Sequence, residues 1–212
     1  ILTTPLVSGD GRCIRPDYAE GAFSTVAVAG ADSTTNALLT AMNATDIMNT
    51  QLLDELQDFA KTANSKYAMS PIRVKDGEEY YILVLHPRAA TALRQDPRWE
   101  KRAISGMTGN IALQNDPIAT GAIGVWEKII VKEANFIRTH TNAANSVRIA
   151  RNLLLGAEAA VMAYAQNLDY CEELFDYNRI MGVSADEIRG FKKLQFDGVD
   201  LNVAQVPCAI KV

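Results

Sequence analysis

Few side chains in this chain of 212 residues are suited to acid, base or nucleophilic chemistry. It has only two histidines, His86 and His140, and three cysteines, Cys13, Cys171 and Cys208. Imidazole is the usual general acid or base near neutral pH, and closely spaced cysteines bind zinc or form redox dithiols. Because the histidines are isolated and the cysteines lie far apart, we expect no metal site, no cofactor and no catalytic set.

His86 is the strongest single candidate for catalysis, because it lies between an apolar stretch and Pro87. α/β folds place ligands at such strand ends, so a small α/β enzyme with His86 as its base is one functional alternative. The favoured interpretation is that the imidazole caps the following helix or packs locally, since no motif places a carboxylate beside it. His140 lies in the polar residues 139–142, which predict a surface loop.

Phosphate-binding and hydrolase motifs are missing from the sequence. The glycine pairs Gly106 with Gly109 and Gly121 with Gly124 have neither the P-loop spacing nor that of the dinucleotide fingerprint. Neither a Gly-x-Ser-x-Gly elbow nor a His-Glu-x-x-His zinc helix occurs. The sequence therefore predicts a structural building block, not an enzyme.

One segment is distinctly basic. Residues 134–157 carry three arginines and no acidic side chain, although the formal net charge of the whole chain is −4. That overall charge argues against a polycation that coats nucleic acid. We therefore expect basic side chains to contact an acidic edge of a neighbouring subunit, and the candidate contact residues are Arg138, Arg148, Arg151, Lys192 and Lys193.

The elements that would position these residues begin with a helix over residues 45–64, where apolar residues recur at spacings of three and four. A helix of that length would extend about 30 Å and could act as a strut. Asp76 and Gly77 then predict a β-hairpin between residues 72–75 and 79–85. The second arm is nearly all apolar, so we expect it at the centre of a sheet with both faces covered.

Pro87 predicts the start of a short helix that ends at Gln95. An ordered, glycine-rich loop over residues 105–124 and a strand over residues 125–131 should follow. Residues 147–165 are apolar on nearly every side, which predicts a buried helix.

Two further patterns concern the end of the chain. Ser184 and Glu187 have the spacing of a capping box, which predicts another helix start. An Asp-Gly dipeptide at positions 197 and 198 predicts a second hairpin, between residues 191–196 and 199–206.

Three blocks of this sequence resemble a known family. The first is residues 80–87 followed by Leu93, Asp96 and Trp99, the second is residues 115–126, and the third is the closing run 175–200. In order and spacing they are similar to blocks of tailed-bacteriophage major capsid proteins, in the N-four type branch. The sequence departs from that pattern where Asp116 is inserted and where Asn178 replaces the usual glycine.

The resemblance implies the α+β fold of tailed-phage capsids, the HK-ninety-seven fold, with a peripheral domain built on a long spine helix and a sheet, and an axial domain. Residues 1–35 are expected to form an extended lead-in, the remnant of an arm or extended loop, and residues 36–85 the peripheral domain with the spine helix. Residues 86–190 would then form mainly the axial domain, and residues 191–212 the strands that return to the peripheral domain. Only about 35 residues precede the spine, too few for both an arm and an extended loop, so we expect those elements upstream in a longer protein.

The function implied by the resemblance is structural. Copies would self-assemble as hexamers and pentamers into an icosahedral virion shell around packaged double-stranded DNA, after synthesis in the host cytoplasm. The main partner is then the chain itself, with portal, scaffold or decoration proteins as further partners and DNA present by non-specific proximity. No membrane or cofactor is implied. A cargo compartment built on the same fold is the alternative within this class.

Overall fold

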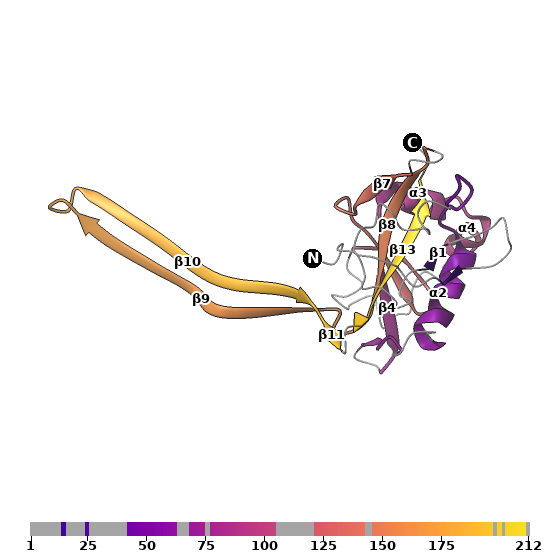
Figure 1. Ribbon diagram of the computed structural model, residues 1–212, viewed down its shortest axis with the longest axis horizontal. Helices are drawn as coiled ribbons and strands as arrows, with labels where there is room; N and C mark the ends of the chain where they lie inside the picture. Colours follow the sequence, from indigo (N-terminus) through magenta and orange to yellow (C-terminus); the bar gives the residue numbers. More distant parts are fainter. Residues whose placement is uncertain are drawn as a thin grey trace.

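The computed structural model describes residues 14–15, 24–25, 42–62, 68–74, 77–104, 121–142, 146–196, 199–200 and 202–210. They form a body in which helices pack on a mixed sheet, and a long two-stranded hairpin that projects away from this body (Figure 1). Two short strands near the start, β1 (Ile14–Arg15) and β2 (Ser24–Thr25), pair with each other. The expected α+β class is confirmed.

A seven-stranded sheet forms the centre of the body. Its strands are β3 (Ile72–Arg73), β4 (Glu79–Leu85), β5 (Ala122–Trp126), β6 (Ile129–Glu133), β7 (Thr139–Thr141), β8 (Arg148–Leu155) and β13 (Val203–Ala209). The order along the sheet is β13-β8-β4-β6-β5, with β3 paired to β4 and β7 paired to β8. Only β4 and β6 run parallel, and the other pairs are antiparallel.

The predicted hairpin before the central strand is confirmed. Ile72 of β3 pairs with Tyr80 of β4. Gly77 has a φ of +76° and donates its backbone N–H to the carbonyl oxygen of Val74 at 2.9 Å. Glycine adopts this left-handed conformation without strain, which is why the Asp-Gly dipeptide predicted the turn correctly.

Strand β4 lies at the centre of the sheet, as predicted, but its two faces differ in burial. Tyr81, Leu83 and Leu85 are at most 3% exposed and point into the main core. Ile82 and Val84 alternate with them and are half-buried. Tyr80 on the same face as Ile82 and Val84 is only 1% exposed, so the expectation that both faces are covered is confirmed for the core face and in part for the other face.

Helix α2 (Thr50–Thr62) packs one apolar side on the sheet. It starts later than the predicted residue 45, because the side-chain oxygen of Asn49 accepts the backbone N–H of Leu52 at 2.8 Å and caps the helix there. Its 13 residues extend about 20 Å. The helix residues buried in the main core are Leu52, Leu53, Leu56, Phe59 and Ala60.

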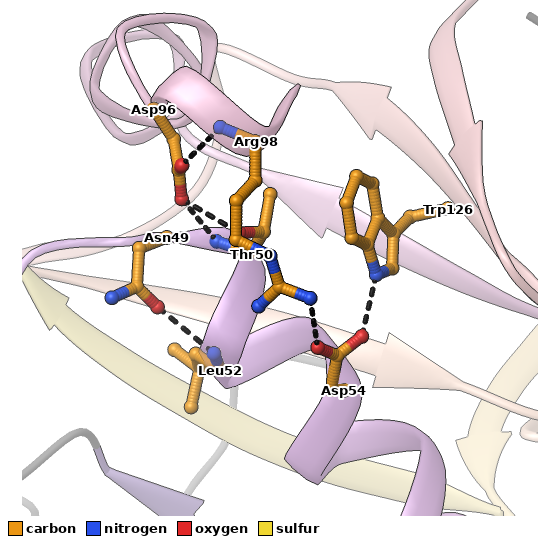
Figure 2. Close-up of polar contacts among 7 residues, drawn as sticks. All are labelled: Asn49, Thr50, Leu52, Asp54, Asp96, Arg98 and Trp126. Carbon is orange, nitrogen blue, oxygen red and sulfur yellow. Dashed lines mark hydrogen bonds and ion pairs between the residues drawn. The ribbon is translucent and has the colours of Figure 1, made fainter. Parts of the chain in front are cut away.

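Asp96 joins three helices. It lies between α3 (Pro87–Arg94) and α4 (Pro97–Ile104), and its Oδ2 accepts the backbone N–H of Thr50 at 2.7 Å and the Thr50 hydroxyl at 2.8 Å. Its Oδ1 accepts the backbone N–H of Arg98 at 2.9 Å (Figure 2). One carboxylate therefore caps α2 and α4 together, whereas the sequence predicted only that α3 ends at this position.

Two tryptophans anchor α4 and β5 to α2. The rings of Trp99 and Trp126 stack with centroids 5.9 Å apart. The indole N–H of Trp126 donates to Asp54 Oδ1 at 2.7 Å, and Arg98 donates to Asp54 Oδ2 at 3.1 Å (Figure 2). The stacked rings and these hydrogen bonds hold α4 and the end of β5 against α2.

The predicted helix over residues 147–165 is wrong. This segment contains strand β8, most of which is buried inside the sheet, and then enters the projecting hairpin. An apolar run without alternation is equally typical of a buried helix and of a strand covered on both faces, so periodicity alone could not separate them.

Two other predictions need correction. The strand expected over residues 125–131 is two strands, β5 and β6, separated by a turn in which Glu127 has a φ of +48°. The capping-box helix start at Ser184 and Glu187 does not exist, because both residues lie within a 14-residue strand. A capping box stabilises a helix only where an amphipathic helical run follows it, and residues 188–193 continue the strand.

The second predicted hairpin is confirmed only close to its turn. Strands β11 (Gln195–Phe196) and β12 (Val199–Asp200) pair antiparallel, whereas residues 203–206 belong to β13 in the main sheet. The dipeptide at positions 197–198 and most of the predicted glycine-rich loop, residues 105–120, lie outside the described residues.

Candidate subunit interface

A long hairpin dominates the outline of the molecule. It consists of β9 (Ala160–Phe175) and β10 (Ile180–Lys193), which pair antiparallel from their ends at the body to the tip. Sixteen residues of strand extend about 50 Å, so the hairpin reaches well beyond the body (Figure 1). Within the described part of the chain, its two strands hydrogen-bond only to each other as a sheet.

The hairpin is bent by an irregular register in its middle. Asp186 pairs with Asp169, Ile188 with Gln166 and Arg189 with Tyr164, so β9 carries extra residues opposite β10. Such bulges bend and twist a strand pair, and the bend is visible in Figure 1. The bulges divide the hairpin into a distal part, residues 169–187, and a root next to the body.

The tip is a turn of left-handed residues. Asp176, Tyr177 and Asn178 have φ values of +50°, +53° and +68°. Asparagine and aspartate tolerate this conformation better than most non-glycine residues, so Asn178 can replace the glycine that the family pattern contains. Tyr177 is 96% exposed at the far end of the hairpin.

In the part of the chain that the structure describes, large apolar side chains are exposed almost only on the hairpin. Among the described residues, fourteen large hydrophobic side chains are exposed, and every one except Phe136 lies on it. They are Val161, Met162, Tyr164, Leu168, Tyr170, Leu174, Phe175, Tyr177, Ile180, Met181, Val183, Ile188 and Phe191. A patch of this kind marks an interaction surface, because isolated proteins rarely expose so much contiguous apolar area.

The distal part of the hairpin has two different faces. Across the register, one face carries Tyr170, Leu174, Met181 and Val183 with one carboxylate, Glu172, and we call it the apolar face. The opposite face carries Asp169, Asp186 and Glu173 around Cys171, with Phe175 and Ile180 next to the tip, and we call it the acidic face. Residues 169–187 include six carboxylates and one arginine, a formal charge of −5.

The basic residues predicted as subunit contacts are not gathered in one place. Arg138, Arg148 and Lys192 are exposed. Arg151 is only 3% exposed and donates to Gln205 Oε1 at 3.1 Å, and Lys193 is 8% exposed. The chain itself covers the last two side chains, so the expectation that they reach a neighbour loses its support. Contact through the three exposed residues stays a prediction.

His86 caps a helix, as the favoured interpretation predicted. Its Nδ1 accepts the backbone N–H of Arg88 at 3.2 Å, and its own backbone N–H donates to Asn152 Oδ1 at 2.9 Å. Burial lowers the pKa of His86, the positive charges of Arg148 and Arg88 lower it further, and Glu133 acts in the opposite direction. The imidazole is therefore held neutral as a hydrogen-bond acceptor, which is a structural role. His140 lies in β7, not in the predicted loop.

Acidification should weaken the fold through His86. Its pKa is lower in the folded state than its ordinary value of 6.5, so the unfolded chain binds more protons once the pH falls below about 6.5. The free energy of unfolding should therefore decrease between about pH 7.5 and about pH 5. His86→Asn keeps a capping oxygen without titrating and should flatten this dependence, whereas His140→Gln should not. An unchanged slope in His86→Asn, measured by urea unfolding at each pH, would contradict this role.

In the described ranges, no three His, Cys, Asp or Glu side chains converge in a way that could hold a metal ion. None of the described helices is long and apolar enough to cross a membrane.

Comparison with known proteins decides the family. The family model described as "Phage capsid protein" matches residues 11–207. This chain belongs to the phage capsid protein family. The curated major capsid protein of Pseudomonas phage KPP25 is 30% identical over 173 residues, which cover 77% of this chain and 44% of that protein. The capsid protein chain therefore spans less than half of the length of that relative.

Solved capsid structures share the fold. The capsid of Ralstonia phage GP4 matches 93% of this chain and 57% of its own chain, with 24% identity and a TM-score of 0.65. The capsid of cyanophage Pam1 matches 99% and 62%, with 20% identity and a TM-score of 0.72. The α+β fold is thus that of HK-ninety-seven-like phage capsids, and the family is structural, not enzymatic.

Proposed function

We propose that this chain is the shell-forming part of a tailed-phage major capsid protein, and that its hairpin packs on a neighbouring copy. The observation that carries this proposal is the hairpin itself, with its apolar side chains exposed along both strands. An isolated two-stranded hairpin is marginally stable in water, and its open edges and apolar face need a cover.

The proposed cover is a second subunit, since the family is one of capsid proteins and their assemblies imply contacts between copies. Burying half-exposed side chains such as Leu174, Met181 and Val183 would each contribute roughly 1 kcal/mol or more. In a shell the hairpin of every copy would pack on one neighbour, and the hairpin of another neighbour would pack on that copy. The modest energy of one contact is therefore repeated across the particle.

The finer assignments rest on the sequence resemblance. It supports the N-four type branch, an arrangement in hexamers and pentamers, packaged double-stranded DNA inside, and a division into peripheral and axial domains near residue 85. Portal, scaffold or decoration proteins would be additional partners in the virion. We favour a phage shell over a cargo compartment because the relatives named above are phage capsid proteins.

Thiol labelling of the apolar face tests the proposal. Met181 is 63% exposed on that face, so the thiol introduced by Met181→Cys, in a Cys13→Ser and Cys171→Ser background, should react rapidly in unassembled subunits. In assembled particles its reaction rate with maleimide should fall about tenfold or more, because the neighbour covers it.

Cys208 provides an internal control for this measurement. It is fully buried in the core, and burial raises the pKa of its thiol to about 12 while a hydrogen bond from Asn152 opposes this shift. Cys208 should therefore stay unreactive in both states. Equal reactivity of Met181→Cys before and after assembly would overturn the proposed packing of the hairpin.

A further inference from the structure

We propose that the acidic face of the distal hairpin docks on a basic corner of the body of a second copy, formed by Arg88 and Arg148. This inference rests on the proposed function, because it names the receptor surface for the hairpin. It goes further in giving the contact a direction, from the hairpin of one copy to the opposite end of the next.

The acidic face carries charge that the described part of the chain leaves uncompensated. Asp169 and Asp186 lie directly opposite each other in the register, and Glu173 follows on the same face. Like charges in directly opposed positions destabilise a strand pair. Across the described ranges, none of these three carboxylates forms an ion pair. A cation from outside the hairpin would relieve this repulsion.

The basic corner is assembled from two elements. Arg148 begins β8, and Arg88 lies in the first turn of α3. The backbone hydrogen bond from His86 to Asn152 holds the start of α3 against β8. Besides burial, both guanidinium charges lower the pKa of His86, and Glu133 acts in the opposite direction.

Arg148 is available for an external carboxylate. Its side chain is exposed and donates only a long 3.4 Å hydrogen bond to the hydroxyl of Thr139. It forms no ion pair with any residue that the structure describes. Planar guanidinium groups bind carboxylates in pairs of parallel hydrogen bonds, so an arginine suits the opposed Asp169 and Asp186.

The two surfaces lie at opposite ends of the subunit. Arg148 is the first residue of β8, and the hairpin leaves the body four residues after β8 ends at Leu155. Seven steps along the strand separate these ends by about 23 Å. The hairpin then extends away from the body (Figure 1), so its acidic face cannot fold back on the basic corner of its own chain.

A contact between unlike surfaces at opposite ends is heterologous. Repetition of such a contact generates a ring when the rotation between copies closes, and an open chain when it does not. The direction of the docking therefore matches the ring symmetry that the proposed function requires. It also predicts that assembly weakens at high salt, because surface charge pairs are screened.

Disulfide trapping tests this docking with a thiol that the protein already has. Cys171 is exposed on the acidic face between Asp169 and Glu173. Thr141 is exposed directly opposite Arg148 in the pairing of β7 with β8, so Thr141→Cys places a thiol beside the basic corner and keeps its charges. Mild oxidation of assembled Cys13→Ser/Thr141→Cys protein should give a ladder of covalently linked chains on a non-reducing gel.

The matched controls define the result. Cys171→Ser should abolish the ladder, and Lys101→Cys, an exposed position on α4, should give at least about tenfold less cross-linking. Particles that form normally but give no ladder with Thr141→Cys would overturn the basic corner as receptor and leave the proposed function intact. A protein that forms no particles at all would contradict the proposed function, and the docking with it.

Charge exchange provides a second, independent readout. Arg148→Glu should lower the assembly yield about tenfold, and Asp186→Arg in the same chain should restore most of it, because the pair is rebuilt with opposite signs. Lys61→Glu, on the exposed side of α2, makes the same change in net charge and should have little effect. Equal losses in Arg148→Glu and Lys61→Glu, or no rescue, would contradict the pairing.

Discussion

Replacing residues 161–192 by a short glycine turn is expected to give a folded subunit that no longer assembles. The described residues of the main core lie in the sheet, in the helices and in the segments next to them, and none lies on the hairpin. Removing the hairpin should therefore leave the free energy of unfolding within about 1 kcal/mol of the wild-type value. Assembly should be lost, because the apolar and acidic faces that meet a neighbour are gone.

Two measurements on this deletion separate folding from assembly. Urea unfolding reports the stability of the body, and sedimentation with electron microscopy reports particles. Tyr177→Ser, which changes only the exposed tip, is the matched control and should still form particles. A hairpin-deleted protein that forms normal shells would show that the hairpin is not the assembly element.

Asp96→Ala should be the most destabilising single substitution of those considered for this chain, at about 2 to 3 kcal/mol. Loss of one helix cap typically costs about 1 kcal/mol, and this carboxylate caps both α2 and α4. The substitution also leaves the hydroxyl and N–H of Thr50, a fully buried residue, without their acceptor. Glu55→Ala, an exposed carboxylate on α2, should change stability by less than about 0.5 kcal/mol.

The effect of Asp96→Ala should depend on pH in a defined direction. Burial would raise the pKa of Asp96, but the hydrogen bonds from Thr50 and Arg98, together with the Arg98 charge, outweigh it and lower the pKa below its ordinary value of 3.8. The stabilisation is therefore complete well above about pH 4 and is lost as the pH falls through the lowered pKa. A difference in unfolding free energy between wild type and variant that stays constant below about pH 4 would contradict this account.

The sequence correctly predicted the turn and helices that depend on only a few neighbouring residues. The Asp-Gly turn before β4, the proline at the start of α3 and the apolar spacing of α2 each act over a few residues, and each appears in the structure. The role of Asp96 could be predicted only in part. Its position after α3 follows from the sequence, but Thr50 is 46 residues away, and only the tertiary fold brings it into contact.

The projecting hairpin could not be predicted by the same rules. Its strands carry exposed apolar side chains on more than one face, and in the sequence this pattern resembles that of a buried helix. The bulges that shift the register near Tyr164 and Asp186 blur the alternation further. The sequence analysis predicted no hairpin tip here, although the run from Asp176 to Asn178 has turn-forming residues at both ends and could have indicated one.

The predicted contact residues include both exposed and buried side chains, and the sequence alone could not separate the two. A count of charges along the sequence placed Arg148 and Arg151 together, but only the first residue of β8 is exposed, and residues 149–154 are buried, so the strand exposes Arg148 and encloses Arg151. Arg151 finds its partner in Gln205, which is 54 residues further along the chain. Sequence alone gives the charge of the segment, and the sheet determines which of its arginines can meet another subunit.

The central claim is that this chain works by contact between copies, with the hairpin as the element that joins them. Electron cryomicroscopy of assembled wild-type particles tests it most directly. The account predicts closed rings in which β9 and β10 of each subunit lie against the body of an adjacent subunit, with the acidic face toward Arg88 and Arg148. Particles in which the hairpin points into solvent and touches no neighbour would contradict it.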